Sequence, residues 1–376
     1  MSTETPVQPV DGQQMLSLVS AFIHQYLVCT EDQLAILALW VLHTHCFLNA
    51  AVTPYLHISS RERESGKTLC IELLSLLCMG PWLTSGFTPA ILLRKLQDEQ
   101  YFTVLLDDCD SVFAHSKSVV ILGLLNRGFG REGAYSIPAS ESGGMTVAEV
   151  EVFCPKAFAG MRPLPSSIQG FCIPMKLEPK EFGAPVKRFN MEEAREAGEP
   201  LALSLYQWSV ENKDQLEAAA SYRENQLPQE LSPRQQDCAE PLLQLADIIG
   251  GEWPARARRA LVHLYAADDE EEASFFDDLL LDIRDAFASK GDPAHIPTGY
   301  TLAYLHGLSG RPWNTWRPDD KPMDALDLAR ILSVKGIRSC NKRVALNQVV
   351  KGYRRKDFLR WWQKLPKPKV DAYVTL

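Results

Sequence analysis

The sequence predicts an α/β fold with a parallel-sheet core, flanking helical regions and a small basic module near the C-terminus. Short apolar strands alternate with helices up to about residue 180, long charged helices follow, and positive charge gathers after residue 330. The expected domains are 1–50 (N-terminal helical segment), 51–180 (sheet core), 181–290 (helical region) and 291–376 (basic module).

The elements are expected from apolar periodicity, and helix starts from capping residues such as Thr30. Helices are expected at 15–29, 31–48, 66–79, 88–97, 116–128, 190–219, 238–249, 254–266, 274–289, 324–334 and 356–365. Strands are expected at 55–59, 103–107, 134–138, 146–153, 156–160 and 171–177, with a hairpin turn at Gly143-Gly144 and a two-stranded wing at 342–350. The acids 268–272 are expected to be a solvated helix start.

The segment between strand 55–59 and the next helix carries the pattern of a phosphate-binding loop. The residues expected to bind a nucleotide are Glu64, Ser65, Gly66, Lys67 and Thr68. Glycine lets the backbone approach a phosphate, the lysine reaches the β- and γ-phosphates, and the threonine offers a hydroxyl to Mg²⁺. Arg61 stands where the full pattern has glycine, so the match is partial. This loop predicts a P-loop NTPase (RecA/AAA-like) core that binds ATP and Mg²⁺.

A second signal lies downstream, where the apolar residues 103–106 lead into Asp107 and Asp108. A metal at the phosphate loop needs a carboxylate at the end of a neighbouring strand. We expect Asp107 to hold Mg²⁺ through water, as a Walker-B aspartate does, while Thr68 offers its hydroxyl to the same ion. The alternative is a buried strand that ends in a solvated acidic turn. The two motifs occur in the right order, each behind a strand, and this pairing favours the nucleotide site.

Asp108 is the candidate catalytic base, because ATPases usually carry a glutamate directly after the Walker-B aspartate. Its side chain is one methylene shorter, and misplacement on the scale of 1 Å can cost about 10²-fold in rate. Slow hydrolysis is therefore expected. Asn126, at the end of helix 116–128, is the candidate for positioning the attacking water.

Charge is distributed unevenly along the chain. The net charge is −8, but residues 331–370 contain twelve lysines or arginines and one acid, Asp357. Such asymmetry is typical of a nucleic-acid-binding tail on an acidic body, and the order of helix, turn, ribbon and basic helix is that of a winged-helix-like module. The candidate DNA-binding residues are Lys342, Arg343, Lys351, Arg354, Arg355 and Lys356. The aromatic residues among them are expected to form core.

The nine cysteines are scattered singly, which predicts reduced thiols and a cytoplasmic location. Without an apolar run of about 20 residues, neither a membrane span nor a membrane partner is expected.

With these features in place, the chain resembles the P-loop ATPases of bacterial mobile elements and prophages known as domain of unknown function 3631, often linked to primase–helicase modules. The resemblance runs through nearly the whole chain. Its blocks include A-L-W-V-L-H-T-H (38–45), I-S-S-R-E-R-E-S-G-K-T (58–68), L-L-D-D-C-D (105–110), P-L-L-Q-L-A-D-I-I-G-G-E-W-P-A-R-A (241–257) and K-G-Y-R-R-K-D-F (351–358).

The resemblance also implies two departures from the family pattern. Asp108 replaces the family's glutamate, and Phe171 aligns with an arginine. If that arginine acts across a subunit interface, its loss would remove charge stabilisation worth 10³–10⁵ in rate in related NTPases. Arg131 is the catalytic candidate to replace it, with Arg127 and Arg162 as alternatives. The family resemblance further implies a homo-oligomer such as a ring.

Two functions follow from these features. The first is an ATP-binding, DNA-associated ATPase of a mobile element, acting in replication as a helicase-like motor or a helicase loader. The alternative is a nucleotide-gated switch that binds DNA or a protein with weak or no hydrolysis, in phage defence or replicon control. A third reading is a core kept only for the stability of the fold.

Overall fold

The computed structural model divides the chain into two compact units, Met1–Asp268 and Asp269–Leu376, which we describe separately. The residues described are 10–60, 62, 64–113, 118–141, 144–180, 185–218, 226–317, 321–345 and 348–365. Among these residues, no helix is both long enough and apolar enough to cross a membrane.

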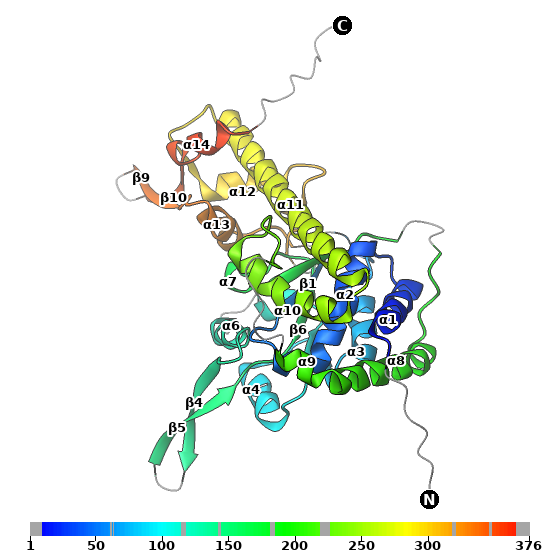
Figure 1. Ribbon diagram of the computed structural model, residues 1–376. Coiled ribbons are helices and arrows are strands. Elements are labelled where there is room, and N and C mark those ends of the chain that lie inside the picture. Colours follow the sequence, from blue (N-terminus) through cyan, green and yellow to red (C-terminus); the bar gives the residue numbers. More distant parts are fainter. Residues whose placement is uncertain are drawn as a thin grey trace, which may run out of the picture. The chain divides into compact units, whose positions relative to one another are not determined.

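A five-stranded parallel sheet forms the centre of the first unit (Figure 1). Its strands are β1 (Tyr55–Ser59), β2 (Pro81–Thr84), β3 (Thr103–Leu106), β6 (Lys156–Gly160) and β7 (Cys172–Lys176). Their order across the sheet is β2-β3-β6-β1-β7, and β6 therefore lies between β1 and β3. The predicted α/β fold with a parallel sheet is confirmed. The edge strand β2 was not predicted, because it is only four residues long and half-exposed.

Helices pack around this sheet in a large apolar core, and a smaller cluster around Val104 of β3 lies beside it. The larger ones are α1 (Gly12–Tyr26), α2 (Glu31–Cys46), α3 (Lys67–Leu77), α8 (Met191–Glu211) and α10 (Pro233–Ile249). Every residue of α2 from Leu34 to Thr44 is buried, which explains its lack of an amphipathic pattern. Side chains from the predicted segments 1–50, 51–180 and 181–290 share this core, so these segments are not separate packing units.

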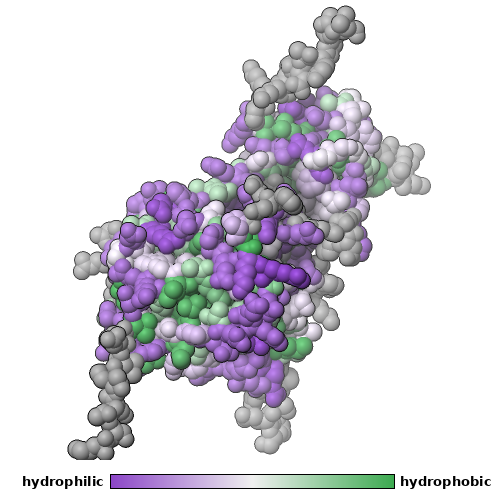
Figure 2. All heavy atoms as spheres, turned by 90° about the vertical axis from the view of Figure 1, so that its right-hand side faces the viewer, coloured by the Kyte–Doolittle hydropathy of each residue, from purple (hydrophilic) through white to green (hydrophobic). Residues whose placement is uncertain are grey.

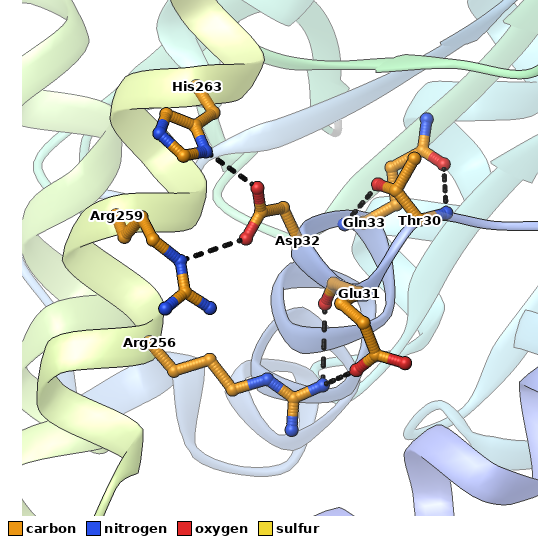
Figure 3. A network of polar contacts seen from close by, with 7 residues as sticks. All are labelled: Thr30, Glu31, Asp32, Gln33, Arg256, Arg259 and His263. Carbon is orange, nitrogen blue, oxygen red and sulfur yellow. Dashed lines mark hydrogen bonds and ion pairs between the residues drawn. The ribbon is translucent and has the colours of Figure 1, made fainter.

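The start of α2 is fixed by local and long-range contacts (Figure 3). Thr30 and Gln33 form the predicted cap as a reciprocal capping box. Asp32 accepts a hydrogen bond from His263 Nδ1 at 2.8 Å and pairs with Arg259 at 3.5 Å. Arg256 pairs with Glu31 at 2.8 Å. Carboxylates at this helix start therefore connect α2 to the first half of α11.

The prediction of two helices at 254–266 and 274–289 is wrong, because one helix, α11, runs from Trp253 to Ser289. Residues 266–274 contain neither glycine nor proline, and their acids are tolerated on an exposed helix face. Phe276, Leu279 and Ile283 of α11 belong to the core of the second unit. The predicted boundary at 290 is therefore too late.

The remaining elements of the first unit surround the sheet or extend from it. They are η1 (Phe47–Asn49), α4 (Pro89–Asp98), α5 (Cys109–Phe113), α6 (Ser118–Arg127), β4 (Ala134–Glu141), β5 (Gly144–Glu151), α7 (Ser166–Gln169) and α9 (Lys213–Ala218). β4 and β5 pair antiparallel in a sheet of their own. Gly144 begins β5, whereas Gly143 of the predicted turn lies outside the described residues.

The second unit contains a three-stranded antiparallel sheet in the order β8-β10-β9. After the end of α11 its elements are β8 (His295–Pro297), α12 (Thr298–His306), η4 (Pro312–Asn314), α13 (Ala325–Val334), β9 (Cys340–Ala345), β10 (Gln348–Arg354), η6 (Arg355–Asp357) and α14 (Leu359–Trp362). The predicted wing is present and longer than expected. The predicted helix 356–365 is reduced to η6 and one turn of α14. Phe358 and Trp362 stack on each other there.

Candidate nucleotide site at the carboxyl edge of the sheet

The loop between β1 and α3 is shaped by two residues with left-handed backbone geometry. Glu64 has φ 59° and Gly66 has φ 86°. A β-carbon on Gly66 would lie 2.7 Å from Leu27 Cδ1, so the position excludes side chains for two reasons. Glycine therefore lets the chain turn directly into the first residue of α3, Lys67, and leaves the helix N-terminus uncovered by a capping side chain.

Lys67 folds back over this loop. Its Nζ donates hydrogen bonds to the carbonyl oxygen of Glu62 at 2.9 Å and to Ser65 Oγ at 3.0 Å. Burial lowers the pKa of the Lys67 ammonium group, and the charges of Asp110 and Asp107 oppose that shift. Glu62, Ser65 and the acids after β3 thus lie together around one cation. Arg61 and Arg63 lie outside the described residues.

Thr68 and Asp107 meet across the sheet edge, as predicted for a pair of metal ligands. Thr68 Oγ1 donates to Asp107 Oδ1 at 3.3 Å. Neighbouring ligands of an octahedral Mg²⁺ at 2.0–2.1 Å are about 3 Å apart, and hard oxygens are the ligands Mg²⁺ prefers. The spacing and the chemistry of this pair therefore fit the cation.

Asp108 follows in a strained backbone conformation, with φ 56°. Its carbonyl oxygen accepts a hydrogen bond from Ser111 Oγ at 2.9 Å, which holds the turn into α5. Burial raises the pKa of the Asp108 carboxyl, and the nearby charges of Asp110 and Asp107 add to this shift. A carboxyl whose pKa is raised is a better proton acceptor once it is ionised.

Asp110 is a site residue that the sequence prediction missed. Its carboxylate accepts hydrogen bonds from the backbone N–H groups of Met161 at 2.7 Å and Arg162 at 3.2 Å. These bonds tie the start of α5 to the residues after β6. A β-carbon on Gly160 would lie 2.6 Å from Cys109 Sγ and 3.0 Å from Asp110 Oδ1, so glycine permits the contact. The sequence did carry a signal for Asp110, since it is the third acid of the block L-L-D-D-C-D.

Arg162 reaches the acidic edge through this link. It follows β6, the strand between β1 and β3, and its charge acts on the carboxyls of both Asp110 and Asp108. Burial raises the pKa of Asp110, while the two backbone hydrogen bonds and the charge of Arg162 act in the opposite direction. Of the three arginines considered from the sequence, Arg162 is the one that lies beside these aspartates.

The structure places Asn126 and Arg131 near the opposite edge of the sheet. Leu125, next to Asn126, accepts a hydrogen bond from the hydroxyl of Tyr55, the first residue of β1, at 2.7 Å. The Arg131 N–H donates to Ala51, four residues before β1, at 2.9 Å. Asn126 is therefore remote from the phosphate loop of its own chain, which follows the other end of β1. The role of Arg131 across a subunit interface stays a prediction.

Phe171 lies at the same amino edge. Its carbonyl oxygen accepts a hydrogen bond from the Tyr55 N–H at 2.9 Å, and its ring stacks on Phe129 at 4.4 Å. The place of the missing arginine is therefore also remote from the phosphate loop of the same chain.

The six predicted DNA-binding residues lie on β9, on β10 and in η6, but they differ in their contacts. Arg354 pairs with Asp357 at 3.0 Å, and Arg355 pairs with Asp292 at 3.1 Å. Lys342, Arg343, Lys351 and Lys356 are exposed.

The family model described as "Protein of unknown function (DUF3631)" matches residues 176–365, just over half of the chain. The chain belongs to the DUF3631 family. The DUF3631 match begins at the last residue of β7 and includes the blocks 241–257 and 351–358. The phosphate loop, Asp107 and Arg162 lie before it, and the family description assigns them no activity.

A curated relative is the uncharacterized 28.9 kDa protein in the xis 5′ region of Saccharopolyspora erythraea. It is 36% identical over 165 residues, which are 44% of this chain and 59% of that protein. The match therefore spans less than two thirds of the relative.

Two solved structures are similar at low identity. A JCV helicase bound to a small-molecule acetamide has 14% identity and a TM-score of 0.33, over 61% of this chain and 64% of that one. The apo C-terminal region of NrS-1 has 11% identity and a TM-score of 0.32, over 94% and 78%. Both TM-scores are below 0.5, and neither similarity supports a statement about the fold or function of this chain.

Proposed function

We propose that the chain is a P-loop NTPase of the RecA/AAA-like type that binds ATP and Mg²⁺ at the carboxyl edge of its parallel sheet. The observation that carries this proposal is the convergence of Lys67, Thr68 and Asp107. The Thr68 hydroxyl and the Asp107 carboxylate are 3.3 Å apart, and both lie beside an ammonium group that is held over a glycine loop.

Each of these residues has a distinct task in binding. The backbone around Gly66 and the N-terminus of α3 favour a phosphate, and Lys67 offsets its charge. Thr68 and Asp107 would hold Mg²⁺, which when bound bridges phosphate oxygens and neutralises their charge. Glu64 and Ser65 shape the loop, Glu64 through its left-handed φ and Ser65 through its hydrogen bond to Lys67.

The residues proposed for hydrolysis are Asp108 and Arg162. Asp108 would take the proton of the attacking water, although its short side chain limits its reach. Arg162 would stabilise negative charge from the end of β6, where Asp110 positions its backbone. Turnover is expected to be slow, because the base is drawn back by one methylene.

We assign the nucleic-acid role to the second unit. Its order of helix, strand, two helices and ribbon, with the sheet order β8-β10-β9, is that of a winged-helix-like module. The relative from a xis 5′ region supports a mobile-element context. In this context the protein acts in DNA replication as a helicase-like motor or a helicase loader.

Homo-oligomer formation is supported by apolar side chains at the surface of the first unit. Leu203 and Val210 of α8 are 65% and 57% exposed and recur at helical spacing. Figure 2 shows the face that carries α1 and α8 in Figure 1, where apolar side chains gather between polar ones. Such a surface can be buried between copies of the chain, for example in a ring.

Titration of ATP with Mg²⁺ by calorimetry tests the proposed site. Lys67→Ala is expected to weaken binding about 10- to 100-fold, since a hydrogen bond to a charged group contributes about 1.5–3 kcal/mol. Lys213→Ala, which removes an exposed lysine of α9, is the matched control and should bind like the wild type. A wild-type protein that binds no ATP, or a Lys67→Ala variant with full affinity, would contradict the proposal.

A second candidate function is a nucleotide-gated switch that binds DNA or a protein without useful hydrolysis, in phage defence or replicon control. The strained, shortened Asp108 favours it. Steady-state ATPase assays with and without DNA separate the two functions. DNA-stimulated turnover identifies the motor, whereas ATP binding with negligible turnover identifies the switch.

A further inference from the structure

We propose that the β9–β10 ribbon of the second unit enters the major groove of double-stranded DNA, and that helix α13 stays outside it. This inference rests on the proposed nucleic-acid role of the second unit. It specifies which surface makes the contact and which form of DNA that surface fits.

The pairing of β9 with β10 places cations on both faces of the ribbon. Arg343 is paired with Val349, Lys342 with Val350 and Asn341 with Lys351. Directly paired residues point to the same face, and successive residues alternate between faces. Arg343 and Lys351 therefore share one face, and Lys342 lies on the other. All three side chains are exposed.

A thin ribbon with cations on both faces matches a groove between two walls of phosphate. The major groove of B-DNA is about 12 Å wide and admits a two-stranded ribbon, whereas the minor groove, about 6 Å wide, is too narrow for it. A flat anionic surface would contact the cations of only one face. The distribution of charge therefore favours a duplex groove.

The local charge supports this placement. Residues 340–356 contain no acid, so nothing within the ribbon sequence repels phosphates. Lys335, Arg360 and Lys364 instead surround the Trp361 ring, with their charged groups at 5.8, 5.0 and 5.5 Å from its centroid. These three cations pack on the Trp361 ring, whereas Lys342, Arg343 and Lys351 extend from the ribbon and are exposed.

Helix α13, in contrast to the ribbon, carries negative charge at its N-terminal end. Asp324 caps its first turn and Asp327 lies within that turn. Arg317 pairs with these carboxylates at 3.0 and 3.6 Å. The exposed side chains Leu326 and Val334, at 65% and 68%, are apolar. Two carboxylates at the helix start disfavour close approach to phosphates, and one exposed cation, Arg330, remains on the helix.

The test is fluorescence anisotropy of the full chain with a labelled 20-base-pair duplex across a series of salt concentrations. The logarithm of the affinity falls with the logarithm of the salt concentration, and each phosphate contact makes this slope steeper by about 0.9. Lys342→Gln, Arg343→Gln and Lys351→Gln should each lower affinity roughly 8-fold at 0.1 M salt. In the triple variant the slope should be shallower by about 2.7. Arg330→Gln, the matched charge change on α13, should stay within about twofold of the wild type.

Three results would overturn the inference while the DNA-binding role stands. The first is a larger loss with Arg330→Gln than with the triple variant. The second is a loss confined to Arg343 and Lys351, because groove entry requires both faces. The third is equal binding of a single-stranded oligonucleotide with the same dependence on the three residues. A wild-type chain that binds no duplex at low salt would overturn both this inference and the proposed DNA role. Unchanged melting temperatures of the variants establish that the ribbon remains folded.

Discussion

At the residue scale, the proposed nucleotide site combines three candidate binding residues with a candidate catalytic acid that is one methylene shorter than the usual glutamate. Lys67, Thr68 and Asp107 lie within hydrogen-bond reach of the loop or of one another. Asp108 is held at φ 56°, a conformation that costs about 1–3 kcal/mol in a residue other than glycine. The fold retains this strain at the edge where the phosphates would lie, which supports a functional position for its side chain.

Asp108→Glu is expected to raise ATP turnover, by up to about 100-fold, because the added methylene lets the carboxylate reach the attacking water. Single-turnover hydrolysis with saturating ATP and Mg²⁺ measures the chemical step directly. Asp108→Asn keeps the length of the side chain but removes its charge, and it should abolish any basal activity. Equal rates for the wild type and Asp108→Glu would show that side-chain length does not limit the reaction.

At the scale of elements, the link between α5 and β6 decides which arginine reaches the site. The Asp110 carboxylate holds the backbone N–H groups after β6, and β6 itself lies between the strands that carry the phosphate loop and Asp107. The close packing of α5 on β6 depends on Gly160, because a side chain at that position would meet the sulfur of Cys109.

Gly160→Ala is expected to separate α5 from β6 and to lower the free energy of unfolding by about 1–3 kcal/mol, as overpacking of a close contact does. ATP turnover should fall further than ATP affinity, because Arg162 moves while Lys67 and Thr68 do not. Thermal melting and nucleotide titration measure the two effects. Gly130→Ala, where an added β-carbon meets nothing within 4 Å, is the control. A Gly160→Ala variant with wild-type stability and turnover would rule out the link.

At the scale of the whole molecule, the core of the first unit buries histidines together with its apolar residues. Burial lowers the pKa of His43 to about 3, and those of His45 and His57 to about 4, from an ordinary value of 6.5. The unfolded chain therefore binds more protons than the folded chain between pH 6.5 and about 4. Stability from these neutral histidines is complete above pH 6.5 and is lost as the pH falls through this window.

The free energy of unfolding should fall by about 1.4 kcal/mol per pH unit for each histidine, or roughly 4 kcal/mol per unit for all three. Burial raises the pKa values of Asp108 and Asp110, which acts in the opposite direction and reduces the net slope. Melting temperatures from pH 7.5 to 4.5 measure the effect. His45→Gln should flatten the profile, since a glutamine can still donate to the Leu77 carbonyl that His45 Nε2 contacts at 2.8 Å. A melting temperature that is constant between pH 6.5 and 4.5 would contradict the assignment.

The sequence by itself determined the local features of this protein. It indicated the alternation of strands and helices, the glycine loop with Lys67 and Thr68, the acid after β3, and the basic ribbon, because each is a pattern of neighbouring residues with its own geometry. Helix α11 shows the limit of that reasoning: a run of acids resembled a break, although nothing in it interrupts a helix.

Only the tertiary structure decided which of these features meet. It placed β6 between β1 and β3, joined Asp110 to Arg162, moved Asn126 and Arg131 to the far edge, and separated the ribbon cations into two faces. Strand order and register arise from pairing between residues far apart in the chain, whereas periodicity reports only neighbours. The candidate loop and Asp108 were therefore visible in the sequence, but the link through Asp110 that brings Arg162 beside them was not.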